Sequence, residues 1–161
     1  MARISFKDHG NPEHVDWALS RVEMAVGMGA LSEAVYGSSR LPVRERESAR
    51  FTIALINDWV VCQDTRAQRA RDVGIDEGFY SEIANWRESS VLTVRERLAA
   101  EYAQRFALEH LGMDDDFWVR LHEAFADDEI VDLTICCGMF LGMGRTLAVI
   151  GVRAPDERLL V

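Results

Sequence analysis

The sequence has 161 residues, 48% of them hydrophobic, and a formal net charge of −9 at pH 7. This length predicts one domain with a core that needs no disulfides, and an odd number of cysteines, three, favours the reducing cytoplasm over a disulfide framework. The acidic excess argues against the basic groove of a nucleic-acid partner, because the arginines are mostly interleaved with acids, as on ion-paired helix surfaces.

A helical pattern begins near the N-terminus. Asn11 is the expected N-cap and Pro12 the expected first residue of a helix over residues 12–36. Gly27 and Gly29 weaken a helix and are expected to kink or split it. The opening stretch MARISFKDHGNPEH lacks the apolar core of a secretory signal, so no export is expected.

The remaining periodic segments also predict helices, and none predicts a strand. Pro42 opens one helix, Gly74 follows another as a stop, and Thr93 with Glu96 forms a capping-box pattern. The expected ranges are residues 42–58, 60–73, 76–86, 93–110, 114–125 and a last helix from Asp127 or Asp128 to about residue 150. The fold class is therefore predicted to be all-α, with a polar tail over residues 153–161.

The last helix is the most apolar segment. Its run ICCGMFLGMGRTLAVIG is apolar around most of the circumference, which is typical of a buried helix. Gly138 and Gly142, one turn apart, would let another helix approach closely. A core helix within one chain and a contact between subunits both fit this pattern. No apolar run reaches the roughly 20 residues that span a bilayer, so no membrane partner is expected.

The order of segments resembles a known family. The stretch LPVRERESARFTIALINDWVVCQDTRAQRARDVGID is similar to the core of the carboxymuconolactone decarboxylase family, which includes alkylhydroperoxidase D. The stretches TVRERLAAEYAQRFAL and FADDEIVDLTICCGMFLGMGRTLAVIGV resemble the last two long helices of that family. The resemblance covers residues 41–152, and residues 1–40 look like the N-terminal helical arm of longer members.

This resemblance implies an alkylhydroperoxidase D-like helical bundle that forms trimers or hexamers. It also implies a site between the helix that carries the family's glutamate and the helix that carries its Cys-x-x-Cys motif. In the peroxidase members, the second cysteine of that motif attacks the peroxide. Glu47 matches the glutamate and Cys62 matches the attacking cysteine. The first cysteine position is occupied by Trp59, and the proton-relay histidine position by Arg66.

The altered motif still permits redox chemistry. On a continuing helix, Trp59, Cys62 and Arg66 would share one face, and a guanidinium near a thiol favours the thiolate that attacks peroxide. Because no local disulfide can form, turnover would need an external thiol reductant or one of the distant cysteines, Cys136 and Cys137. We therefore predict a peroxidase-type antioxidant oxidoreductase with Cys62, Glu47 and Arg66 as catalytic residues and Trp59 as a substrate-binding residue.

Two other functions stay open. In a decarboxylase-like lyase acting on a carboxylated lactone, Arg66 would bind the carboxylate, Glu47 would move protons and Trp59 would form an apolar wall. Alternatively, the chain is a catalytically inactive oligomeric scaffold or small-molecule binder. No cofactor is expected, and no metal, because the spacing of the histidines does not suit metal binding (His9, His14, His110 and His122). The expected partners are further copies of the chain and a small-molecule substrate.

Overall fold

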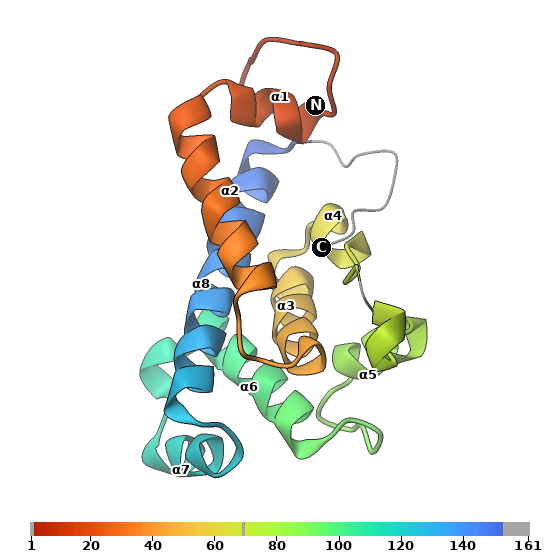
Figure 1. Ribbon diagram of the computed structural model, residues 1–161, viewed down its shortest axis with the longest axis vertical. Coiled ribbons are helices and arrows are strands. Elements are labelled where there is room, and N and C mark those ends of the chain that lie inside the picture. Colours follow the sequence, from red (N-terminus) through yellow and green to blue (C-terminus); the bar gives the residue numbers. More distant parts are fainter. Residues whose placement is uncertain (1, 69, 153–161) are drawn as a thin grey trace.

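The computed structural model describes residues 2–68 and 70–152, and within these ranges it contains helices and no strand (Figure 1). The all-α prediction is therefore confirmed, while the polar tail predicted over residues 153–161 lies outside the described residues. The helices are α1 (Glu13–Leu19), α2 (Val22–Gly37), α3 (Val43–Asn57), α4 (Val60–Asp64), α5 (Glu77–Ala84), α6 (Val94–Leu108), α7 (Asp115–Ala124) and α8 (Asp127–Ile150), with short 3-10 turns η1 (Ala70–Val73) and η2 (His110–Gly112).

Helix α3 lies at the centre of the bundle. It packs against α6 and α8, and α8 also packs against α2 (Figure 1). Ile53 of α3, Phe117 of α7 and Leu133 of α8 are almost completely buried in the main core. A second, smaller core lies between α3 and α5, where Phe51 and Ile83 are buried. Burial of these large side chains supplies most of the stabilisation of such a bundle, about 1.5–3 kcal/mol for each one.

The N-terminal arm is split into two helices, but not at the glycines expected to kink or split it. The chain breaks at Arg21, whose φ of −144° and ψ of 70° are not helical, so α1 and α2 are separate helices. Gly27 and Gly29 lie inside α2 and do not split it. Pro12, not Asn11, is the N-cap of α1. Asn11 instead donates a side-chain hydrogen bond to Asp16 at 2.9 Å, which ties the preceding loop to the helix.

The helix predicted over residues 60–73 is also wrong. Helix α4 ends at Asp64, and Thr65 has an extended backbone with ψ of 137°. The cause is tertiary, because guanidinium groups of Arg50 and Arg66 donate hydrogen bonds to the carbonyls of residues 62, 63 and 65 that a longer helix would use itself. The expected single helical face carrying Trp59, Cys62 and Arg66 therefore does not exist.

Helix α8 combines a core role with an exposed apolar face. Among the described residues it is the one helix long and apolar enough to cross a membrane by length and composition alone, which the sequence pattern did not suggest. Its packing against α2, α3 and α6 is that of a core helix in a bundle. The described chain leaves Gly138 and Gly142 without a close neighbour, so the close helix approach predicted for them does not occur within one chain.

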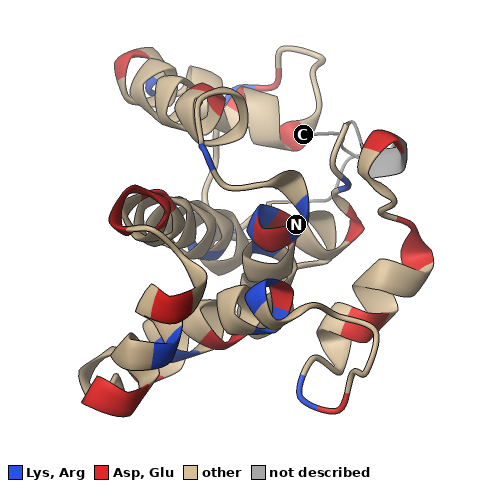
Figure 2. Ribbon diagram, turned by 60° about the horizontal axis from the view of Figure 1, so that its bottom comes forward, with Lys and Arg blue, Asp and Glu red and all other residues tan. Residues whose placement is uncertain are grey.

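Charged residues are interspersed over the described helices rather than gathered on one face (Figure 2). Several arginines form ion pairs with acids of other helices, as the interleaved sequence indicated. Arg95 of α6 lies 2.6 Å from Glu129 of α8, and Arg120 of α7 lies 2.8 Å from Glu101 of α6. These partly exposed pairs each contribute little to stability, about 0–1 kcal/mol, but they neutralise the basic groups on the surface.

Candidate functional site

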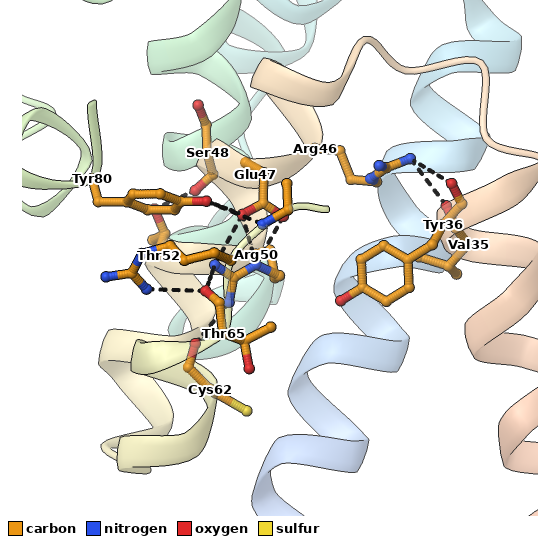
Figure 3. Close-up of polar contacts among 12 residues, drawn as sticks. Val35, Tyr36, Arg46, Glu47, Ser48, Arg50, Thr52, Cys62, Thr65 and Tyr80 are labelled. Atoms are coloured by element: carbon orange, nitrogen blue, oxygen red, sulfur yellow. Dashed lines mark hydrogen bonds and ion pairs between the residues drawn. The ribbon is translucent and has the colours of Figure 1, made fainter. Parts of the chain in front are cut away.

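A buried ion pair forms the base of the site (Figure 3). Glu47 is fully buried and Arg50, one turn later on α3, is 4% exposed. The Nε atom of Arg50 lies 2.9 and 3.0 Å from the two carboxylate oxygens of Glu47, and Nη2 lies 2.9 Å from Oε2. The hydroxyl of Tyr80 donates a further hydrogen bond to Oε2 at 2.9 Å. The carboxylate is thus fully engaged in the protein interior.

Arg50 also connects α3 to the segment that carries the cysteine. Its Nη1 donates to the carbonyl oxygen of Cys62 at 2.7 Å, and its Nη2 donates to that of Thr65 at 2.9 Å. Carbonyls at the end of a helix lack intrahelical partners, so this guanidinium caps α4. Burial acts to lower the pKa of Arg50, but the adjacent Glu47 carboxylate outweighs it and raises the pKa, so the group stays a cation.

A cavity of about 170 Å³ lies beside this pair. Cys62 and Trp59 form part of its wall, and the remaining lining is mostly apolar, with the largest share from α8 and α3 and further residues from α1, α2 and the α4 segment. Cavities of about this size in protein interiors hold a molecule such as benzene. The lining residues are His14, Ser32, Tyr36, Arg50, Ile53, Ala54, Trp59, Val61, Cys62, Thr65, Met139, Phe140, Met143, Gly144 and Leu147.

The thiol of Cys62 is half-buried at this wall. Burial raises the pKa of Cys62, and the positive charge of Arg50 opposes that rise in part. Helix α8 approaches the last residue of α3 closely at Gly144. A Cβ there would lie 2.6 Å from the Asn57 amide nitrogen and 3.5 Å from the Cys62 sulfur. Gly144 therefore keeps the space next to the thiol open.

The four site residues predicted from the sequence lie in three places. Trp59 and Cys62 line the cavity, whereas Glu47 lies behind it and reaches it through Arg50. Arg66 is turned to the other side, where its guanidinium lies 3.0 and 2.8 Å from the Glu77 carboxylate oxygens. The cation that lines the cavity with the thiol and acts on its pKa thus belongs to Arg50. Its position three residues after Glu47 on a predicted helix was a usable signal for this pair.

The N-terminal arm supplies cavity residues that the sequence pattern did not point to. His14 of α1 and both Ser32 and Tyr36 of α2 line the same cavity as Cys62. In Figure 3 the Tyr36 ring faces the region of Arg50 and Cys62. Sequence reasoning treated the arm as an addition outside the site, because at least 26 positions separate these residues from Cys62 and no local motif joins them.

The other two cysteines have a different environment. Cys136 and Cys137 are buried in the main core on α8 and do not line this cavity. Burial raises the pKa of Cys136 to about 11 and that of Cys137 well above its ordinary value. Within residues 2–68 and 70–152, no group of three or more His, Cys, Asp or Glu side chains is arranged to hold a metal ion.

Comparison with known proteins supports the fold more strongly than any function. No protein-family model matches the chain. Over 88 residues, or 55% of this chain, the sequence is 35% identical to an uncharacterised protein of Mycobacterium tuberculosis, in strains CDC 1551 / Oshkosh and H37Rv. The match covers 31% of that protein, so the chain spans about a third of the length of the curated relatives it matches.

Two crystal structures share the architecture. A protein of unknown function from Agrobacterium tumefaciens, described as a candidate antioxidant defence protein AhpD, has a TM-score of 0.78 over 98% of this chain and 100% of its own, at 24% identity. An uncharacterised peroxidase-related protein from Silicibacter sp. TM1040 has a TM-score of 0.77 over 91% of this chain and 78% of its own, at 21% identity. The chain therefore has the alkylhydroperoxidase D-like helical fold that its sequence resemblance predicted.

Proposed function

We propose that this protein is a one-cysteine thiol peroxidase in which Cys62 reduces small apolar hydroperoxides. The observation that carries the proposal is the position of the thiol in the wall of a mainly apolar cavity, beside a buried cation. An apolar cavity favours a substrate with a hydrocarbon group over a fully hydrated one such as hydrogen peroxide. The peroxidase-related and antioxidant descriptions of the two fold neighbours point in the same direction.

The reaction follows from thiol chemistry. The thiolate sulfur of Cys62 attacks the terminal oxygen of the hydroperoxide, an S–O bond forms as the O–O bond breaks, and the alkoxide that leaves takes up a proton to become an alcohol. Sulfur is oxidised to a sulfenic acid and the peroxide is reduced. The charge of Arg50 favours the thiolate over the neutral thiol, in opposition to burial.

Recycling requires an external thiol. The position of the missing first cysteine is occupied by Trp59, and the cysteines on α8 are buried in another part of the core. A small thiol therefore condenses with the sulfenic acid and releases water. A second thiol then cleaves the mixed disulfide and restores Cys62. We propose a cytoplasmic location, because small thiols are available there.

The decarboxylase-like alternative has less support. It needs Arg66 to bind a carboxylate and Glu47 to transfer protons within one cavity. Arg66 is committed to Glu77, and neither Arg66 nor Glu47 lines the cavity. No observation favours this reaction over the thiol chemistry.

We also propose that further copies of the chain cover the exposed face of α8. Val131 and Ile135 are 56% and 49% exposed, and they continue into Gly138 and Gly142 at spacings of four, three and four residues. Such a stripe of apolar and small residues suits close packing of a second α8. Light scattering should give the mass of a trimer or hexamer, and Ile135→Glu should lower it. A monomer at micromolar concentration would contradict this part of the proposal.

Peroxide consumption tests the main proposal. With dithiothreitol as reductant, the wild type should consume tert-butyl hydroperoxide and cumene hydroperoxide faster than hydrogen peroxide. Cys62→Ser should abolish this activity, whereas the matched variant Cys136→Ser should retain it. If no peroxide is consumed above the Cys62→Ser background, the chain is a scaffold or binder and not a peroxidase.

A further inference from the structure

The cavity holds one group whose role the reaction above leaves open. His14, on the N-terminal helix α1, lines the same cavity as Cys62. Its Nδ1 atom is buried and has no hydrogen-bond partner among the described residues. A buried polar atom without a partner is destabilising, so such an atom next to a cavity calls for a functional explanation.

The other titratable groups of the cavity cannot accept a proton near neutral pH. Arg50 is a permanent cation held by Glu47. Burial raises the pKa of Tyr36 well above 10, so its hydroxyl stays protonated and does not act as a base. Burial lowers the pKa of His14, so its imidazole is neutral and carries one acceptor nitrogen.

The titratable groups near the cavity but outside its lining supply no further proton acceptor. The Glu47 carboxylate is occupied by Arg50 and Tyr80, and Arg66 faces Glu77. Helix α8 contributes Met139, Phe140, Met143, Gly144 and Leu147 to the cavity, and none of them titrates. His14 is therefore the single base among the described residues that line the cavity.

We propose that His14 is the proton acceptor for Cys62, and that it returns this proton to the leaving alkoxide. The inference rests on the proposed peroxidase function and names a residue for its proton transfer. The thiol proton moves to the imidazole, which leaves the thiolate that attacks the hydroperoxide. When the O–O bond breaks, the imidazolium gives that proton to the alkoxide, so the alcohol leaves and His14 is neutral again.

This assignment gives the N-terminal arm a part in the chemistry. Arg66, four residues after Cys62, pairs with Glu77 and does not line the cavity. His14 reaches the cavity from another helix and supplies an imidazole there. The break at Arg21 between α1 and α2 is what lets α1 turn back over the cavity end of the bundle (Figure 1).

The test uses His14→Gln, with His110→Gln as a matched control because His110 is exposed and lies outside the cavity. The rate of Cys62 oxidation by tert-butyl hydroperoxide at pH 7 should fall about 100-fold in His14→Gln, as expected for loss of a general base. The wild-type rate should show an inflection below pH 6.5 that His14→Gln lacks. His110→Gln should keep both the rate and the inflection.

A second measurement does not depend on peroxide or on a variant's stability. In the wild type, NMR titration of the histidine ring nitrogens should give a different pKa for His14 before and after alkylation of Cys62. A wild-type rate and pH profile in folded His14→Gln, or an unchanged His14 titration after alkylation, would overturn the inference.

The two proposals fail in different ways. If the wild type does not react with peroxide at all, the proposed function is wrong. Alkylation of Cys62 by iodoacetamide at pH 7 then still tests His14, because a proton acceptor for the thiol should make the wild type react faster than His14→Gln. Equal alkylation rates in the wild type and in His14→Gln would rule out His14 as the proton acceptor, even if the protein consumes peroxide.

Discussion

Two arginine–glutamate pairs lie on either side of Tyr80, and they have opposite relations to Cys62. The Tyr80 hydroxyl donates to Glu47 in the buried pair with Arg50, and the Arg66 guanidinium lies 4.2 Å from the Tyr80 ring centre. Arg50 holds the Cys62 carbonyl and lines the cavity. Arg66 pairs with Glu77, whose side chain is 65% exposed. Arg66, at the motif position four residues after Cys62, therefore has a structural role, while the positive charge beside the thiol comes from Arg50 of α3.

The largest expected difference between the pairs is in stability. Arg50→Met would leave the Glu47 carboxylate buried without its cation. It would also remove the arginine donor of the Cys62 carbonyl and one of the two arginine donors of the Thr65 carbonyl. We expect a loss of about 3–5 kcal/mol in the free energy of unfolding, measured by urea denaturation. The double variant Glu47→Leu/Arg50→Met should regain part of this loss, because no unpaired charge stays buried. A cost below about 1 kcal/mol for Arg50→Met would contradict the buried-pair description.

A smaller difference should appear in the pH dependence of Cys62 labelling. Because burial raises the pKa of Cys62, the rate of alkylation should keep increasing with pH beyond the ordinary thiol pKa. Arg50 opposes this rise, so Arg50→Met should move the alkaline limb to higher pH and slow labelling at pH 8 by about 3–10-fold. Arg66→Met should stay within about twofold of the wild type. Equal effects of the two variants on the labelling rate would contradict the assignment of Arg50 as the cation that acts on Cys62.

The smallest expected effect belongs to the outer pair. Arg66→Met removes an ion pair with an exposed carboxylate and two hydrogen bonds to carbonyls at the end of α4. The free energy of unfolding should fall by about 1 kcal/mol, and Glu77→Gln should lower it by about 0.5 kcal/mol. Thermal unfolding of both variants beside Arg50→Met would measure the ranking. An Arg66→Met cost as large as that of Arg50→Met would mean that Arg66 belongs to the buried network.

Local signals predicted the long helices well. The capping box of Thr93 and Glu96 is present at the start of α6, and the helix that opens after Pro42 was expected nearly at its observed bounds. Helix α4 could not be predicted in the same way. Its local pattern favours a longer helix, and it ends early because arginines from α3 and from the following loop bind its last carbonyls.

The site was predictable only in part for the same reason. The resemblance identified Cys62 and Trp59, which do share the cavity, and Glu47, which acts on it through Arg50. The side on which Arg66 lies depends on the backbone after Thr65, which no helical period describes. The contribution of His14 depends on how the arm folds back, and that is a tertiary arrangement without a sequence motif.

Trapping of the sulfenic acid tests most directly whether Cys62 is the residue that attacks the peroxide. The wild type is treated with one equivalent of tert-butyl hydroperoxide in the presence of dimedone, which traps sulfenic acids, and adducts are quantified by mass spectrometry on the Cys62 peptide and on the peptide carrying Cys136 and Cys137. We expect the Cys62 peptide to carry nearly all of the dimedone adduct. An unmodified Cys62, or equal modification of the two peptides, would contradict this expectation.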